Sequence, residues 1–289
     1  MLVASFVKTL SPPEWIDLRT AHERRVEPWV TPRLERAALG VKHPVDDFLF
    51  EDYPNRPSLL RRWHPGFGCA LLGDEAECYL GVPGYMATQH GVTVEALPER
   101  RRPFVQWLGD FLASTANRAA FFGCHGLHEW AMVYKSSAVR HASQPLRLPP
   151  DEIAAVVDSL TMRCSHYDAF RFFTPEARPL NRLQPTRASS PGLEQPACLH
   201  ANMDLYKWAF KLAPWCPSEL VADTFELARD IRELDMRASP YDLTSHGYTA
   251  VPIETSEGRA QYEKCQREFA ERARPLRRRL MLLCDSLLA

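Results

Sequence analysis

The stretch that decides the fold class is SELVADTFELARDIRELDMR, which runs from Ser218 to Arg237. Its larger apolar residues recur at the spacing that places side chains on one face of a helix, at Leu220, Leu227, Ile231 and Leu234. Charged residues occupy most of the positions between them. The pattern predicts an amphipathic helix of about five turns.

Other segments follow the same period. Ser11, Pro12 and Glu14 form a capping-box sequence that predicts a helix start. Six glycines between residues 63 and 97 predict loops and short strands, and residues 175–196 form the longest irregular stretch. The remaining helices are expected at residues 12–39, 45–60 (interrupted at Pro54 and Pro57), 103–117, 128–134, 151–163, 202–212 and 256–289 (kinked at Pro275).

These elements predict a mainly α fold. At roughly 100–200 residues per domain, 289 residues allow one large domain or two small ones. Because no internal repeat stands out, we expect a single helical-bundle-like domain over residues 1–289, with a small irregular Gly/Pro-rich insert. The formal net charge of −1 does not suggest a strongly basic nucleic-acid-binding domain. The basic runs at residues 100–102 and 274–279 are interpreted as solvated helix faces.

Cysteine usage and hydropathy bear on location. The eight cysteines contain no CxxC pair, and the first ten residues do not resemble a secretory signal. No run of 18 apolar residues predicts a membrane span. We therefore expect reduced thiols, a cytoplasmic location and no membrane partner.

The first segment that suggests chemistry is GCHGLHEWAMVY, residues 123–134. His128, Glu129, Trp130 and Tyr134 stand together in an apolar setting. Burial beside aromatic rings would make Glu129 a general acid or base. The alternative interpretation is a polar helix start with an acidic first turn.

The second segment is RCSHYDAFRFF, residues 163–173. His166, Asp168 and Arg171 stand among aromatic residues that include Tyr167 and Phe170. Buried charges need partners, so the segment predicts either a ligand pocket or an ion pair between Asp168 and Arg171.

The third segment is QPACLHANMDLYKW, residues 195–208. His200, Asp204 and Lys207 share one helical face, which Lys211 extends. With Trp208 nearby, this row predicts a group that orients proton transfer, while a solvated face is the alternative.

The fourth segment is again residues 218–237. Its carboxylates recur at i, i+3, i+7 and i+10, at Asp223, Glu226, Asp230 and Glu233. Arginines are interleaved, so a salt-bridged surface face competes with a binding site. The polar turn that begins at Asp235 and ends at Asp242 could extend such a site.

Metal motifs are less direct. Cys164 with His166 and Cys198 with His200 form two Cys-x-His pairs that could build a tetrahedral zinc site, although this spacing is not a usual zinc signature. HExxH, P-loop, GxSxG and EF-hand motifs do not occur, nor does a pair of ExxH motifs. A different His/carboxylate metal site stays open.

The chain also resembles a bacterial family commonly labelled 3-methyladenine DNA glycosylase. The similar stretches span nearly the whole chain: KHPVDDFLF (42–50), RRWHPG (61–66), LHEWAMVY (127–134), CSHYDAFRFF (164–173), LHANMDLYKW (199–208) and ARDIRELDMR (228–237). The resemblance implies an enzyme that flips an alkylated purine into an aromatic pocket and cleaves its glycosidic bond. Asp168 or Asp204 would then stabilise the sugar cation or activate water.

Three hypotheses follow. The first is a cofactor-free N-glycosidase hydrolase acting on alkylated DNA, with a nucleoside or other small molecule as alternative substrate. The second is a metal-dependent enzyme resembling a non-haem iron oxygenase, with iron or zinc held by residues from His128, His166, His200, Asp168, Asp204, Asp230 and Glu233. The third is a small-molecule binding protein. For a site within residues 123–242, we predict Asp168, Asp204, Glu129 and His200 as catalytic, and as substrate-binding His128, Trp130, Tyr134, His166, Tyr167, Phe170, Arg171, Asn202, Lys207, Trp208, Asp230, Glu233 and Arg237.

Overall fold

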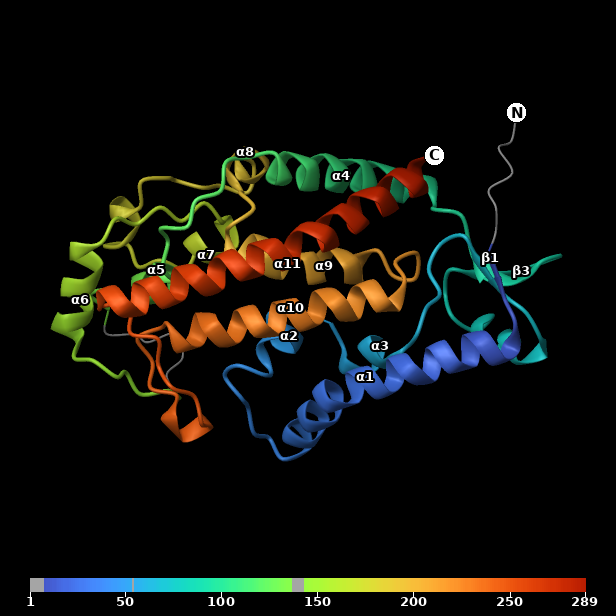
Figure 1. The fold of residues 1–289 in the computed structure, drawn as a ribbon, viewed down its shortest axis with the longest axis horizontal. Coiled ribbons are helices and arrows are strands. Elements are labelled where there is room, and N and C mark those ends of the chain that lie inside the picture. Colours follow the sequence, from blue (N-terminus) through green and yellow to red (C-terminus); the bar gives the residue numbers. More distant parts are fainter. Residues whose placement is uncertain (1–7, 54, 137–142) are drawn as a thin grey trace. The chain divides into compact units, whose positions relative to one another are not determined.

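Helices dominate the computed structural model, which describes residues 8–53, 55–136 and 143–289 (Figure 1). The mainly α fold class is therefore confirmed. The helices are α1 (Pro12–Ala38), α2 (Phe48–Glu51), α3 (Pro57–Arg61), α4 (Arg102–Ala116), α5 (Leu127–Ala131), α6 (Pro150–Ser159), α7 (Tyr167–Phe170), α8 (Ser190–Leu193), α9 (Leu199–Lys211), α10 (Ser218–Arg237) and α11 (Ser256–Leu288). Four 3-10 turns accompany them, at η1 (Asp74–Tyr79), η2 (Glu99–Arg101), η3 (Arg178–Leu180) and η4 (Thr244–His246).

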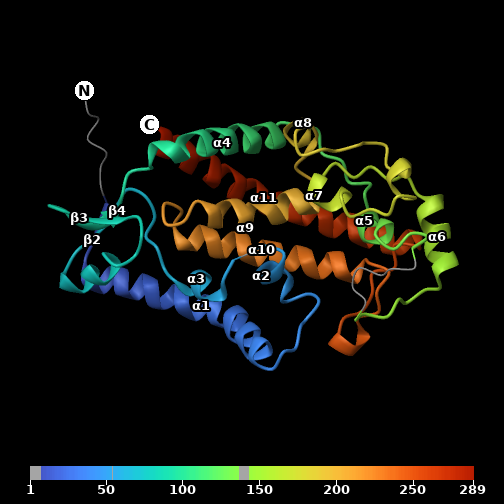
Figure 2. The ribbon, with the colours of Figure 1, turned by 180° about the vertical axis from the view of Figure 1, so that it is seen from behind.

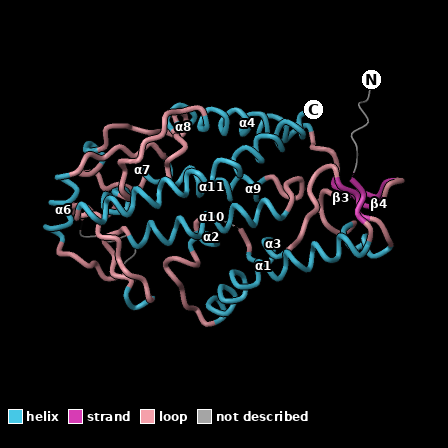
Figure 3. The backbone as a smooth tube through the Cα atoms, in the orientation of Figure 1, coloured by secondary structure: helices cyan, strands magenta, loops and turns pink. Residues whose placement is uncertain are grey.

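The strands form one small sheet, coloured magenta in Figure 3. Its order is β1-β2-β4-β3, with β1 (Lys8–Leu10) parallel to β2 (Cys69–Leu71) and the pairs β2/β4 and β3/β4 antiparallel. The strands β2, β3 (Tyr85–Thr88) and β4 (Gly91–Val94) lie in the predicted Gly/Pro-rich insert, whereas β1 was not predicted. Gly91 has φ +109°, and a Cβ there would lie 2.3 Å from the Leu71 carbonyl oxygen. Only glycine fits this approach of the two strands.

Contacts group the chain into two compact units. The first comprises residues 1–110, 206–226 and 278–289, and the second residues 111–205 and 227–277. The first contains α1, α3 and the sheet, with a core that includes Trp15, Val26 and Trp63. The second contains α5, α6 and α7, which Figure 2 shows from behind. It also contains all of the candidate site residues that precede Tyr206 or follow Glu226. The single domain expected over residues 1–289 stays a prediction.

Local signals set several helix ends. The Ser11 backbone N–H donates to Glu14 Oε2 at 2.8 Å, so the predicted capping box starts α1. The helical stretch expected over residues 45–60 is interrupted, and α2 and α3 are its helical parts. Pro57 begins α3 and does not interrupt a helix, because a first-turn proline has no N–H to lose. The interruption expected at Pro54 lies outside the described residues.

Two further boundaries need correction. Helix α6 ends at Ser159, four residues before the expected end. Helix α9 begins at Leu199, not at Asn202. Cys198, which is not one of the usual capping residues, precedes the first helical residue, so the sequence carried no capping signal at this start. The shift places His200 in the first turn of α9. Within the described ranges, no helix is both long and apolar enough to cross a bilayer.

Candidate metal-binding site

His128 is positioned by the short helix α5. Gly126 leads into this helix with φ +71°, and a Cβ there would approach the Tyr262 ring to 3.2 Å. A glycine is therefore favoured where the chain turns into the protein interior. The turn that follows buries Leu127, His128 and Glu129. A histidine and a carboxylate thus enter the interior side by side.

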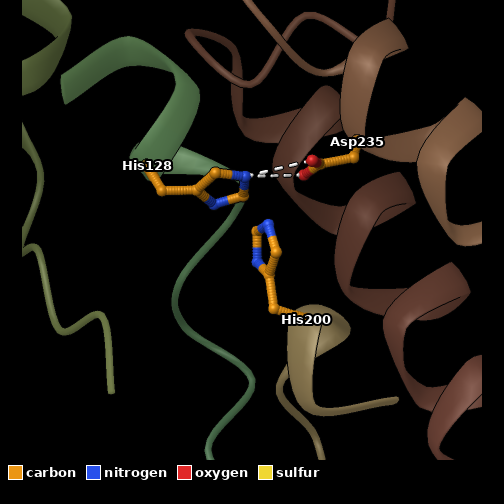
Figure 4. Close-up of side chains that lie close together, drawn as sticks. All are labelled: His128, His200 and Asp235. Atoms are coloured by element: carbon orange, nitrogen blue, oxygen red, sulfur yellow. Dashed lines mark hydrogen bonds and ion pairs between the residues drawn. The ribbon is translucent and has the colours of Figure 1, made fainter. Parts of the chain in front are cut away.

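Helix α10 supplies the carboxylate that His128 faces. Asp235 is fully buried, and its Oδ1 and Oδ2 lie 2.9 Å and 3.1 Å from His128 Nε2 (Figure 4). Arg232 lies one turn earlier on α10, with Nη1 3.0 Å from Glu129 Oε1 and 3.5 Å from Asp235 Oδ2. The guanidinium therefore lies between two buried carboxylates. Such a charge-assisted arrangement holds Asp235 in one orientation.

His200 completes this group from the first turn of α9. Its ring centroid lies 4.4 Å from that of His128, with an angle of 81° between the ring planes. In Figure 4 its ring points toward the gap between His128 and Asp235. One ligand atom from each of the three residues lies within 4.8 Å of the others. With metal–ligand bonds of about 2.1 Å, ligand atoms at right angles lie about 3 Å apart and opposite ones about 4.2 Å, so the three can share one ion.

Protonation differs among the three groups. Burial would lower the pKa of His128, but the facing Asp235 carboxylate raises it above its ordinary value. Burial, together with the neighbouring His128, lowers the pKa of His200 well below its ordinary value. Burial would raise the pKa of Asp235, yet the histidine beside it holds this pKa at about 2. His200 is therefore neutral and Asp235 ionised, the states in which both bind metals.

A second group lies next to the first. His166, Asp168 and Asp204 each offer a ligand atom within 4.8 Å of the others. The His166 and His200 rings are nearly parallel, at 18°, with centroids 5.2 Å apart. His166 Nδ1 lies 2.9 Å from Glu194 Oε1, and Asp168 Oδ1 lies 3.4 Å from Arg171 Nε. The five metal ligands predicted from residues 128–204 therefore all lie in these two groups.

The second unit buries more negative than positive charge. Among its described residues, four carboxylates are buried, Glu129, Glu194, Asp204 and Asp235, against two arginines, Arg232 and Arg277. The difference of four minus two is two negative charges with neutral histidines. Buried charge is costly unless it is compensated, so positive charge near these carboxylates stabilises them.

A small cavity of about 20 Å³ adjoins the histidines. That volume holds about one water molecule. Its walls include His128 and His200 together with the thiols of Cys124, Cys164 and Cys198. Burial raises the pKa of Cys164 to about 12, so its thiol is neutral. In the described ranges neither group of metal ligands contains a cysteine. The predicted zinc site built from two Cys-x-His pairs is therefore not formed.

Several predicted substrate-binding residues are structural. Trp130 is fully buried, and its indole N–H donates to the Ala238 carbonyl at 2.9 Å, so its ring is a core element. Tyr134 donates to Asp158 Oδ1 at 2.6 Å, and Phe170 packs against Phe173 with centroids 5.1 Å apart. Asn202 accepts a hydrogen bond from the buried Arg277. Of the aromatic rings predicted to stack on a base, Tyr167 is only partly buried.

Asp230 and Glu233, from the predicted carboxylate row of α10, form the salt-bridged surface face that was the alternative to a binding site. Asp230 pairs with Arg272 at 2.7 Å, and Glu233 pairs with Arg237 at 3.0 Å. These residues form partly exposed ion pairs of the second unit, not members of the two ligand groups.

Lys207 and Trp208 belong to the first unit, where Trp208 meets Trp107 with ring centroids 5.6 Å apart. They are thus assigned to a different unit from Asp168 and Asp204. Glu129, predicted as an acid or base, lies against Arg232.

Arg232 and Glu194 were not predicted to belong to the site. Asp235 was predicted only as the start of a polar turn that could extend a site, whereas it lies within α10. Arg232 and Asp235 lie next to Ile231 and Leu234 in the apolar seam of α10, three residues apart. A charged pair at i, i+3 inside an apolar seam is the signal that could have identified them. Glu194 carries no such signal, because it lies in the irregular stretch.

No protein-family model matches this chain, and neither a curated protein nor a solved structure shows significant similarity to it. The resemblance to glycosylase-labelled proteins stays a prediction.

Proposed function

We propose that the protein is a metal-dependent enzyme whose first ligands are His128, His200 and Asp235. One observation carries the proposal: two histidines and one carboxylate from three separate helices present ligand atoms within 4.8 Å of one another. Two histidines and a carboxylate that leave other positions open are typical of non-haem iron(II) oxygenases. Iron(II) bound there would supply oxygen activation, which protein side chains alone do not provide.

The surroundings leave room for one further small ligand, such as a water molecule, beside the histidines. The adjoining cavity reaches both histidines and is otherwise lined largely by thiols and apolar side chains. Arg232 holds the carboxylate ligand, so the ligand set is fixed before an ion arrives. All eight cysteines are free thiols. We therefore also propose a cytoplasmic location, where thiols remain reduced.

The second candidate function is the N-glycosidase. It is favoured by one observation, that Asp168 and Asp204 belong to the same group while the neighbouring Tyr167 is only partly buried. A carboxylate pair beside an aromatic ring could stabilise an oxocarbenium-like sugar and hold the base. This function requires no metal.

The deciding experiment measures metal content and base release on the same preparations. The full chain is loaded anaerobically with iron(II), desalted and analysed, and assayed for release of 3-methyladenine from alkylated DNA. We expect stoichiometric iron in the wild type, loss of iron in Asp235→Asn, and retention of iron in Asp230→Asn, which makes the same substitution on the same helix but outside the ligand group.

Oxygen consumption with candidate substrates then follows on the iron-loaded protein. Metal-free protein that releases base would reject the metal proposal and support the glycosidase. Equal iron retention in Asp235→Asn and Asp230→Asn would also reject it.

A further inference from the structure

We propose that the protein binds a second divalent ion at His166, Asp168 and Asp204, so that its metal centre holds two neighbouring ions. The inference rests on the proposed function, since it extends the same centre. It differs in its ligands, because the second group shares no residue with His128, His200 and Asp235.

The ligand geometry suits an ion. One atom from each of His166, Asp168 and Asp204 lies within 4.8 Å of the others. Ligand atoms on opposite sides of a divalent ion are separated by about 4–4.5 Å, so only a small contraction is needed on binding. His166 and Asp204 are buried and Asp168 is partly exposed. The ion would therefore have an interior side formed by protein and an outer side close to solvent.

Helix α9 connects the two groups. His200 and Asp204 are four residues apart, and this spacing places them on the same face of one helix. His200 belongs to the first group and Asp204 to the second. The near-parallel rings of His166 and His200, with centroids 5.2 Å apart, also place the groups side by side. One rigid element thus presents a ligand to each ion.

The neighbours of His166 and Asp168 are compatible with binding. Glu194 Oε1 lies 2.9 Å from His166 Nδ1, and a carboxylate beside the ring also occurs in carboxylate–histidine–metal arrangements. Asp168 is paired with Arg171, but both side chains are more than two-fifths exposed. Exposed pairs of this kind contribute about 0–1 kcal/mol, so an ion can replace the guanidinium at little cost.

The two groups differ in charge and in donor atoms. The first group contains one buried carboxylate, and the second contains a buried and a half-exposed one. The donor sets also differ, with two nitrogens and one oxygen in the first group and one nitrogen and two oxygens in the second. The oxygen-rich set suits Mn²⁺.

The test measures Mn²⁺ binding to the full chain, with equilibrium dialysis for the number of bound ions and electron paramagnetic resonance for the coupling between them. The wild type should bind two ions per chain, and the spectrum of the loaded protein should be broadened by magnetic coupling between them. Asp168→Asn and Asp204→Asn should each bind one ion and give the resolved six-line spectrum of an isolated Mn²⁺. Asp230→Asn is the matched control and should bind two.

The outcomes separate the two proposals. One ion in the wild type, unchanged in Asp168→Asn and Asp204→Asn but lost in Asp235→Asn, would overturn the second site and leave the first intact. No bound ion in the wild type would overturn both. If Asp204→Asn does not fold, Asp168→Asn decides, since its half-exposed side chain is not part of the core.

Discussion

Removal of the Arg232 charge should strongly destabilise the fold. It is 1% exposed, and its Nη1 lies 3.0 Å from Glu129 Oε1 and 3.5 Å from Asp235 Oδ2. Arg232→Met keeps much of the side-chain volume but removes the positive charge. It leaves two buried carboxylates with less compensation. Breaking a buried pair from one side costs about 3–5 kcal/mol, so we expect a loss of that size in the free energy of unfolding.

A double-mutant cycle separates this charge effect from lost packing. Glu129→Gln removes one of the two carboxylates, and the double variant should lose less than the sum of the single losses, by about 1–3 kcal/mol. Urea unfolding followed by circular dichroism measures each value, provided that the slope with denaturant is unchanged. Arg272→Met is the control, because its pair with Asp230 is partly exposed and should contribute about 0–1 kcal/mol. A loss for Arg232→Met no larger than that for Arg272→Met would refute the reasoning.

Three further predictions concern stability. Burial holds the pKa of His64 at about 4, whereas in the unfolded state it is about 6.5, so the unfolded state takes up the proton first. The free energy of unfolding should therefore fall by roughly 3 kcal/mol as the pH drops from about 6.5 to 4. Urea unfolding of His64→Gln across this range should show a weaker pH dependence than the wild type, and an equal dependence would contradict the prediction. A Cβ at Gly258 would lie 2.0 Å from the Pro252 carbonyl oxygen, so Gly258→Ala should lower the free energy of unfolding by about 1–3 kcal/mol, and an unchanged urea midpoint would disprove the contact. Ser11→Ala removes a hydroxyl 2.7 Å from Glu14 Oε2 and should lower the free energy of unfolding by about 1 kcal/mol in the same assay. An unchanged free energy of unfolding would show that the capping box does not stabilise the helix.

The sequence predicted the helices that carry their own period. Helix α10 has the expected bounds because its apolar seam repeats over five turns, and α1 begins where the capping box indicates. Strand β1 escaped prediction because three residues cannot show a period, and its partner is far along the chain, with Lys8 opposite Cys69. The start of α9 was misplaced because Cys198, which is not one of the usual capping residues, precedes Leu199.

The sequence predicted many of the residues of the candidate site but not which of them lie against one another. Histidines and carboxylates in apolar segments indicated His128, His166 and His200, because such groups need partners when buried. Which partner each one meets depends on helix packing, and the sequence does not contain that information locally. Asp235 pairs with a histidine 107 residues earlier, whereas the exposed carboxylate row of the same helix attracted the prediction.

The polar interior of the second unit bears on the metal proposal. Replacing buried ion pairs by apolar residues is often neutral or stabilising, so stability alone gives no reason to bury Asp204 and Asp235 beside three histidines. The raised pKa of His128 allows this ring to carry one positive charge, which still leaves the buried carboxylates of the described unit in excess by one. A divalent ion bound in place of the His128 proton would also cancel the one remaining negative charge. The charge count and the ligand geometry share the carboxylates Asp204 and Asp235, and the metal proposal accounts for both.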